Sequence, residues 1–199
     1  SVLGIRPLLW KNGWPVAGEV FKEGTYEIES ERRGYALELA VDFVRMEYTR
    51  HRFWEKDDTP VVPLKPQTLE DVIGTWPQGK INVRISDYMF RPHQKWTITA
   101  VPDGGGYLGG PYYKIVIEGT NRALAATAGA EIVTVPEFTG APEQLWRIDQ
   151  LTDGTYRIMP KKVPGTDKEL VLVSVGDSTP SLGIFDMNSD NSKWNFRDH

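Results

Sequence analysis

The stretch EQLWRIDQLTDGTYRIMPKK, residues 143–162, joins a Gln-x-Trp triplet to a Gly-Thr-Tyr-x-Ile motif. Related triplets occur at residues 94–96 (QKW) and, with serine in place of glutamine, at residues 192–194 (SKW). The three tryptophans are about 50 residues apart, a period typical of repeat architectures. A segment of strand-like alternation begins at each tryptophan. The sequence therefore predicts three copies of one structural unit.

A second shared element lies upstream of each triplet. It reads Gly-x-Tyr-x-Ile from Gly24 and Gly154, and GPYYKI from Gly110, and is followed by a polar turn containing glycine and then a Leu-rich strand. Strand, turn and strand in this order indicate a β-hairpin. Strand-period segments separated by Gly, Pro and Asp turns fill most of the chain, so the predicted class is all-β.

The first unit is longer than the other two and is predicted to contain an insertion at about residues 44–79. The insertion is polar and rich in proline. Near its end, Thr68-x-x-Asp71 resembles a capping box and Gly74 a helix C-cap, which predicts one short helix. Outside the units, residues 1–22 contain an Asn-Gly pair between two apolar runs, a hairpin signal. The Gly-rich segment 103–110 is interpreted as a flexible connection between the first two units.

Composition limits the possible functions. A net charge of -4 argues against nucleic acid as a partner, because phosphate binding needs clustered Lys and Arg. No apolar run approaches the roughly 20 residues that span a bilayer, so no membrane partner is expected. The absence of cysteine excludes thiolate metal sites and a Cys nucleophile. The 3 histidines are scattered, and the calcium-like segment 186–197 lacks the required Gly and Glu. We therefore expect no metal, no cofactor and a monomer.

The three triplets, each closing a hairpin unit, resemble the ricin-B-type β-trefoil of carbohydrate-binding module family 13. The resemblance covers residues 23–199, once the insertion is set aside, and implies a six-stranded barrel closed on one side by three hairpins. Such closure repeats the same interior position three times, so Trp96, Trp146 and Trp194 are predicted to be core residues. The neighbouring glutamines are predicted to bond backbone groups of the adjoining loop.

The resemblance also implies a shallow sugar site in each unit. Such a site has an acidic residue after the first turn, an aromatic platform on the next strand, and Asn or Gln before the tryptophan. In the first unit the acidic position falls on Glu38, and in the other two it falls on Ala125 and Ser174. The platform position falls on Ser86 in the first unit, with Tyr88 two residues on, and on Phe185 in the third. A sugar ring needs an apolar face to pack against and polar groups for its hydroxyls. The sugar-binding residues predicted from the first and third units are Glu38, Arg84, Tyr88, His93, Gln94, Phe185, Asp186 and Asn191. The insertion offers another ligand surface, at His51, Phe53 and Trp54.

The segment GIRPLLWKNGWPVAGE, residues 4–19, resembles the end of glycoside hydrolase family 43 catalytic domains, particularly arabinan-degrading ones. This resemblance implies that residues 1–22 are the end of a preceding catalytic domain or a linker hairpin. The chain is then a non-catalytic, C-terminal module that targets an attached hydrolase to arabinan or arabinoxylan. It would act outside the cell, secreted or on a bacterial surface, with a polysaccharide or oligosaccharide and the catalytic domain as partners. The alternative is a structural module that packs on the catalytic propeller without binding sugar.

Overall fold

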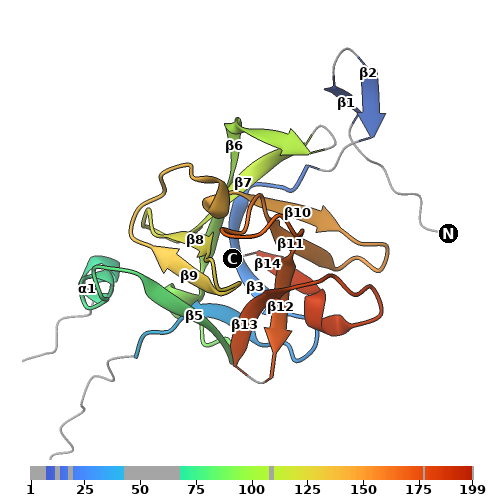
Figure 1. The fold of residues 1–199 in the computed structure, drawn as a ribbon. Coiled ribbons are helices and arrows are strands. Elements are labelled where there is room, and N and C mark those ends of the chain that lie inside the picture. Colours follow the sequence, from blue (N-terminus) through green and yellow to red (C-terminus); the bar gives the residue numbers. More distant parts are fainter. Residues whose placement is uncertain are drawn as a thin grey trace, which may run out of the picture. The chain divides into compact units, whose positions relative to one another are not determined.

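The computed structural model describes residues 8–11, 14–17, 20–42, 68–107, 110–176 and 178–198. Its contacts divide the chain into two units, residues 1–40 with 77–199, and residues 41–76. Its regular secondary structure is mostly β-strand, with one short α-helix and three 3-10 turns among the described residues (Figure 1). Candidates His51, Phe53 and Trp54 lie outside the described residues.

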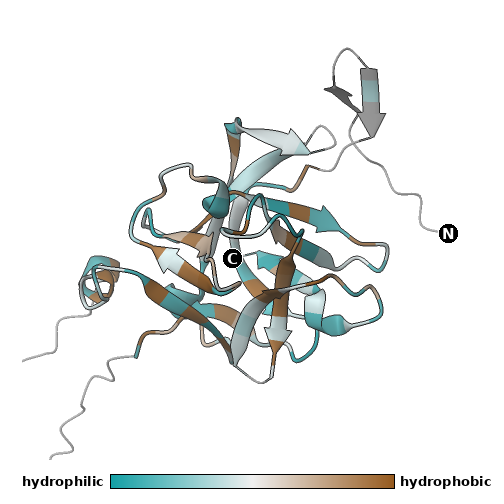
Figure 2. Cartoon of the chain, in the orientation of Figure 1, coloured by the Kyte–Doolittle hydropathy of each residue, from teal (hydrophilic) through white to brown (hydrophobic). Residues whose placement is uncertain are grey.

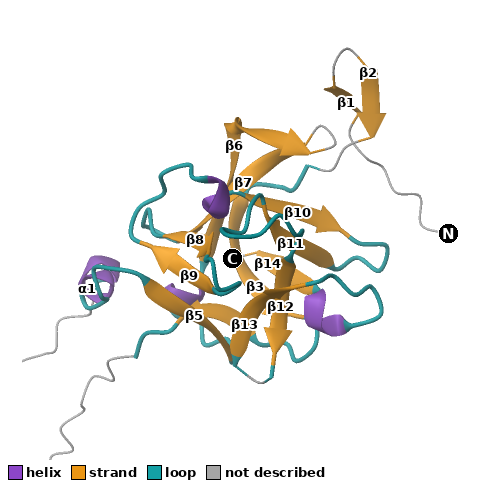
Figure 3. Cartoon of the chain, in the orientation of Figure 1, coloured by secondary structure: helices purple, strands orange, loops and turns teal. Residues whose placement is uncertain are grey.

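Each repeat consists of four strands, with a single turn of 3-10 helix before the last one (Figure 3). The strands of the first repeat are β3 (Gly24–Ser30), β4 (Ala36–Leu39), β5 (Ile81–Ser86) and β6 (Trp96–Tyr107). Those of the second are β7 (Gly110–Ile117), β8 (Ala123–Ala126), β9 (Ile132–Val135) and β10 (Trp146–Gln150). Those of the third are β11 (Tyr156–Pro160), β12 (Val171–Val175), β13 (Thr179–Gly183) and β14 (Trp194–Asp198). The 3-10 turns are η1 (Pro92–Gln94), η2 (Pro142–Gln144) and η3 (Asp190–Ser192).

The first and last strands of the three repeats close into a barrel. Strand β6 pairs with β3 and β7, β10 with β7 and β11, and β14 with β11 and β3. The pairing of β14 with β3 joins the end of the chain to its first repeat, so these six strands leave no unpaired edge in the ring. The predicted β-trefoil is confirmed.

The three tryptophans occupy equivalent interior positions, as predicted. Trp96, Trp146 and Trp194 are each 0% exposed. The indole Nε1 of each donates to a leucine carbonyl within its own repeat, at 2.8, 2.9 and 2.9 Å. The accepting residues are Leu37, Leu124 and Leu172. Three buried rings, each tied to the second strand of its repeat, fix the same packing three times.

The barrel contains an aromatic cluster around Phe21. This ring lies 5.2 Å from Tyr26, 6.0 Å from Tyr113, 5.5 Å from Tyr156 and 4.6 Å from Phe196, measured between ring centres. The three tyrosines are the residues that pair with the three tryptophans across the barrel strands. In the second repeat, Tyr113 is therefore the counterpart of Tyr26 and Tyr156. Those two tyrosines follow Gly24 and Gly154 by two residues, whereas Tyr113 follows Gly110 by three, so Gly110 is not the counterpart of the other two glycines.

Strand β5 follows the expected alternation and helps to position the first-repeat candidates. Its apolar residues point inward and its polar residues outward, and Figure 2 shows the corresponding brown and teal bands. Arg84 is one of the outward residues and stands opposite Glu38 of β4 in the register. The alternation therefore brings two of the predicted site residues together.

Residues 103–107 of the Gly-rich segment belong to strand β6 and do not form a flexible connection, contrary to the sequence interpretation. Strand β6 continues to Tyr107, and its end pairs with the start of β7 after a register shift between Val101 and Gly106. A Cβ added at Gly106 would lie 2.5 Å from the carbonyl oxygen of Gly110. Glycine at this position allows the two backbones to approach closely. The hairpin therefore continues to Tyr107, where the sequence suggested a loop.

Two shorter elements lie outside the trefoil strands. Strands β1 (Leu8–Lys11) and β2 (Trp14–Ala17) pair as an antiparallel hairpin, as predicted, and residues 12–13 between them lie outside the described part. Helix α1 (Leu69–Gly74) has the predicted capping box of Thr68 and Asp71. Gly74 is its last helical residue and Thr75 its C-cap, one position later than predicted. The boundaries predicted at residue 22 and at about 44–79 stay predictions.

Candidate functional site

A buried carboxylate lies at the centre of the first-repeat candidate site. Glu38 is 3% exposed. Its Oε1 accepts from Arg84 Nε at 2.5 Å, and its Oε2 accepts from Gln94 Nε2 at 2.6 Å. His93 Nε2 lies 3.3 Å from the same Oε2. The structure thus brings together four residues that were predicted as a group from three separate segments.

The environment of Glu38 keeps it ionised. Burial by itself raises the pKa of this carboxyl group, but hydrogen bonds from His93, Arg84 and Gln94 outweigh the burial, and the net pKa is lowered from 4.5. A carboxylate with both oxygens occupied is held rigidly and in turn orients its donors. Of these donors, the Arg84 side chain is the most accessible, at 39% exposed. Glu38 therefore positions polar groups at the surface from a buried location.

The glutamines of the triplets perform the predicted role. Gln94 Oε1 accepts from the backbone N–H of Met89, and Gln144 Oε1 from that of Thr139, both at 2.8 Å. Gln94 Nε2 also donates to the carbonyl of Asp87. Buried amide groups are thereby paired, and the loop before each 3-10 turn is fixed.

Tyr88 belongs to the loop that Gln94 holds. Its two chain neighbours, Asp87 and Met89, both bond to the Gln94 amide. The Tyr88 ring is half-buried and lies 4.8 Å from the ring of Phe90, which is 74% exposed. Burial, followed by the charge of Glu27, raises the pKa of the Tyr88 hydroxyl to about 12. At neutral pH the phenol is therefore an uncharged donor and acceptor next to an exposed ring.

Phe185 occupies the equivalent position in the third repeat. In the first repeat the third strand ends at Ser86, which pairs with Ala36, and in the third repeat it ends at Gly183, which pairs with Val171. Tyr88 and Phe185 each follow that last residue by two positions. Phe185 is half-buried, and the Arg157 guanidinium lies 4.9 Å from its ring centre. The first and third repeats thus each present an aromatic ring at the same point after the third strand.

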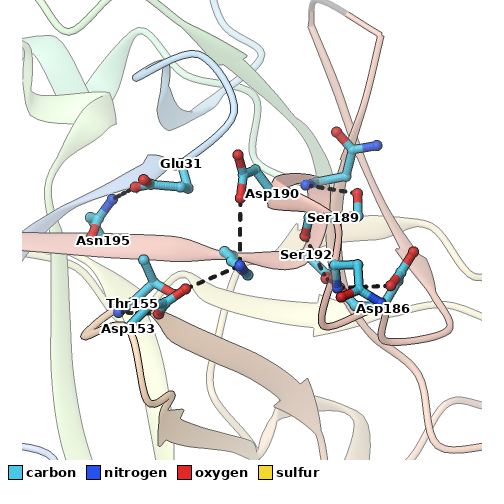
Figure 4. A network of polar contacts seen from close by, with 11 residues as sticks. Glu31, Asp153, Thr155, Asp186, Ser189, Asp190, Ser192 and Asn195 are labelled. Carbon is cyan, nitrogen blue, oxygen red and sulfur yellow. Dashed lines mark hydrogen bonds and ion pairs between the residues drawn. The ribbon is translucent and has the colours of Figure 1, made fainter.

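Asp186 and Asn191 help to shape the third-repeat loop (Figure 4). Asp186 Oδ1 accepts from the N–H of Asn188, and the Asn191 N–H donates to Ser189 Oγ. Ser192 replaces the repeat glutamine and donates to the Asp186 carbonyl at 3.0 Å. Both Asp186 and Asn191 are exposed, but no contact places either against Phe185 among the described residues. Their predicted role in sugar binding stays a prediction.

The acidic position of the third repeat is one residue earlier than predicted. The carbonyls of Leu37, Leu124 and Leu172 are equivalent because each accepts from a repeat tryptophan. The residue after each leucine is Glu38, Ala125 or Val173, so Ser174 is not the counterpart of Glu38. Ser174 instead is 1% exposed and accepts from the Ser30 hydroxyl. Only the first repeat has a carboxylate at this position.

The sequence reasoning missed a charged cluster beside Phe185. Asp149 Oδ2 accepts from Arg157 at 2.6 Å and lies 2.7 Å from Arg147 Nε. Asp149 and Arg157 are opposite each other in the pairing of β10 with β11. Alternation alone puts both on the outer face, but only the register shows that they touch. The cluster fixes the guanidinium that lies against Phe185.

A further ion pair closes the third-repeat loop. Lys193 Nζ lies 3.0 Å from Asp153 Oδ2 and 3.5 Å from Asp190 Oδ1; both acids are labelled in Figure 4. Hydrogen bonds from the Thr155 hydroxyl and backbone, together with Lys193, lower the pKa of Asp153 to about 2. These contacts join the connection between β10 and β11 to the segment before β14, and they support the structure of both.

Comparisons with known proteins agree with this geometry. Residues 92–179 match the family model described as "Ricin-type beta-trefoil lectin domain-like". No curated protein sequence matches the chain. Within the described residues, no helix has the length and apolar character to cross a membrane.

Several solved structures share the fold at low sequence identity. A designed threefold-symmetric protein, ThreeFoil, superposes with a TM-score of 0.56 at 19% identity, covering 88% of this chain and 99% of that one. The β-trefoil lectin of the Vibrio vulnificus hemolysin/cytolysin, solved with N-acetyl-D-lactosamine bound, gives 0.53 at 12% identity, covering 87% and 93%. A mosquitocidal holotoxin gives 0.59 at 15% identity, covering 90% of this chain but 18% of the toxin. These likenesses show the β-trefoil fold for this chain, and residues 92–179 are similar to the ricin-type lectin family model.

Proposed function

We propose that this chain is a non-catalytic carbohydrate-binding domain with sugar sites in its first and third repeats. One observation carries the proposal: Tyr88 and Phe185 stand at equivalent positions, and each of these two repeats also holds an arginine fixed by a carboxylate. In the first repeat that arginine is Arg84, held by Glu38, and in the third it is Arg157, held by Asp149. An aromatic face packs against the apolar face of a sugar ring, while fixed donors bond its hydroxyls.

The second repeat is not expected to bind. Ala125 replaces the acid, and the residue that follows β9 by two positions is Glu137. Phe138 stands next to it, with Lys114 Nζ 5.4 Å from its ring centre. This repeat supplies an internal control, because it has the same framework without the same pair of groups.

The lectin-like fold supports carbohydrate as the ligand class, and domains of this kind typically act by binding. More specifically, the ligand is a plant cell-wall polysaccharide, arabinan or arabinoxylan. The domain binds it outside the cell and so targets an attached glycoside hydrolase to it. This assignment rests on the resemblance of residues 4–19 to the end of a hydrolase catalytic domain. Tethering raises the local concentration of enzyme at its substrate without new chemistry.

Affinity gel electrophoresis with arabinan, arabinoxylan and dextran tests the proposal. We expect arabinan or arabinoxylan to retard the chain, and Tyr88→Ala or Phe185→Ala to lower the affinity of its own site about tenfold, roughly 1.4 kcal/mol. The double variant should lose retardation, while Phe138→Ala, the matched second-repeat control, should keep it. Unchanged urea midpoints would establish that the variants are folded. Wild-type retardation of the double variant, or no retardation by any plant polysaccharide, would contradict the proposal.

The second candidate function is a structural module that packs on an attached domain. Four exposed apolar side chains favour it, on the same two loops: Met89 and Phe90 at 60% and 74%, and Ile184 and Met187 at 75% and 71%. Hydrogen exchange separates the two functions. In the longer enzyme, docking would protect the amides of both loops relative to the isolated domain, whereas a sugar site would be protected only when polysaccharide is added.

A further inference from the structure

A pocket of about 410 Å³ lies outside both candidate sugar sites. Its wall includes Tyr107 and Tyr112 from the β6–β7 hairpin, Arg147 from β10, and Lys161, Lys162 and Lys168 from the segment after β11. The volume is within the roughly 300–1,000 Å³ usual for small-ligand pockets. None of the residues predicted from the sequence as sugar-binding lines it.

The Gly-rich hairpin builds one wall of this pocket. Strand β6 reaches Tyr107 because Gly106 can approach the Gly110 backbone, and the hairpin projects from the barrel in Figure 1. Tyr107 is 40% exposed. The hairpin therefore presents a large aromatic surface where a flexible connection would present none.

Two cations are fixed against the two tyrosine rings. The Arg147 guanidinium carbon lies 3.2 Å from the centre of the Tyr107 ring, and Asp149 holds its Nε. Lys161 Nζ lies 5.1 Å from the Tyr112 ring centre and donates to the Gly104 carbonyl at 2.6 Å. Such cation–π and hydrogen-bonded arrangements preorganise positive charge at an aromatic wall.

The charge of the pocket is opposite to that of the chain. Four basic side chains line it, Arg147, Lys161, Lys162 and Lys168, against two acidic ones, Asp167 and Glu169. The chain as a whole has a net charge of -4. Positive charge concentrated in a hollow attracts an anion, and tyrosine faces favour a ligand that also has an apolar ring surface.

We propose that this pocket binds a carboxylated sugar, a hexuronate unit of an acidic polysaccharide. The sugar ring packs on the tyrosine faces, the tyrosine hydroxyls bond ring hydroxyls, and the lysines and Arg147 pair with the carboxylate. The proposal does not depend on sugar binding at Tyr88 and Phe185, since the side chains that contact the ligand and the ligand charge are different, although Asp149 holds both Arg147 of this pocket and Arg157 beside Phe185.

Isothermal titration calorimetry with trigalacturonate, and with galactotriose as a neutral ligand of matched size, tests this proposal. We expect trigalacturonate to bind at low ionic strength and at least tenfold more weakly in 0.5 M NaCl, because salt screens exposed charges. Galactotriose should bind at least tenfold more weakly than trigalacturonate. Lys162→Glu combined with Lys168→Glu should reduce trigalacturonate affinity at least tenfold, while Lys80→Glu, an exposed control elsewhere, should not.

The two sets of sites are distinguished by a cross-test. The Tyr88→Ala/Phe185→Ala double variant should bind trigalacturonate like the wild type, whatever becomes of its arabinan binding. The inference is overturned if trigalacturonate does not bind, if galactotriose binds equally well, or if the lysine variants bind unchanged. Equal competition by inorganic phosphate would also overturn it, because that result indicates a general anion site with no sugar recognition.

Discussion

Replacing Glu38 by alanine, alone and together with Arg84→Val, tests how the first repeat is held together. In Glu38→Ala, Arg84 Nε and Gln94 Nε2 each lose a carboxylate acceptor. Removing one partner of a buried ion pair costs about 3–5 kcal/mol. The 39% exposure of the Arg84 side chain lets water replace part of the lost interaction. We therefore expect a loss of about 2–3 kcal/mol in the free energy of unfolding.

The second repeat shows what the same position looks like without charge. The register that pairs Glu38 with Arg84 pairs Ala125 with Val133, and both of these residues are buried. The double variant Glu38→Ala/Arg84→Val recreates that apolar pair. We expect it to be more stable than Glu38→Ala alone by about 1–2 kcal/mol, a coupling typical of residues in contact.

Urea unfolding followed by tryptophan fluorescence measures these differences. A loss of 2–3 kcal/mol moves the midpoint down by about 1–2 M at the usual dependence on urea. The lowered pKa of Glu38 means that its contribution is present above pH 4.5, the usual value, and is lost as the pH falls through the lower folded value. The single variant Arg84→Val completes the comparison. A double variant whose loss of stability equals the sum of the two single losses would refute the reasoning, since it would show that Glu38 and Arg84 do not interact energetically.

Two further predictions concern the framework. The free energy of unfolding should fall by about 2–4 kcal/mol in each of the variants Trp96→Phe, Trp146→Phe and Trp194→Phe, because each change leaves a buried carbonyl without its donor and removes ring volume. Losses that differ from one another by more than about 1.5 kcal/mol in urea unfolding would contradict the threefold equivalence. Asp153→Asn should lower the thermal midpoint at pH 6 but not at pH 2. The Asp153 carboxyl has a pKa of about 2 in the folded chain and an ordinary pKa of 3.8, so it stabilises the folded state above pH 3.8, and this stabilisation is lost as the pH falls through about 2. Asp190→Asn is the matched control, because its carboxylate lies 3.5 Å from Lys193 Nζ. If Asp153→Asn changes the thermal midpoint equally at both pH values, the ionised form of Asp153 does not stabilise the loop.

Much of the site was predictable because the repeats align the same positions. Glu38, His93 and Gln94 come from segments far apart in the chain, yet the trefoil pattern assigns them to one site, and the structure bonds them together. Phe185 was predicted at the aromatic platform position, whereas that position was assigned to Ser86 in the first unit, with Tyr88 two residues on. The strand registers correct this assignment, because they make Tyr88, and not Ser86, equivalent to Phe185. Their binding of sugar stays a prediction.

Other features could not be predicted, for reasons that are physical. Glycine in the segment 103–107 is compatible with a loop or a closely packed strand, and the choice depends on the neighbouring backbone at Gly110. The Asp149–Arg157 pair depends on the register of two strands, and a shift of one residue would move a side chain to the other face. The misplacement of the third acid at Ser174 has the same origin.

The sequence by itself determined the repeat, the all-β class and the burial of three tryptophans, since a period of about 50 residues with one large apolar ring per unit has few folded solutions. The tertiary structure alone decided that Asp149 meets Arg147 and Arg157, and where a hollow remains. Those outcomes depend on cross-strand register and on close backbone approach between residues that are distant along the chain, and no local pattern encodes either one.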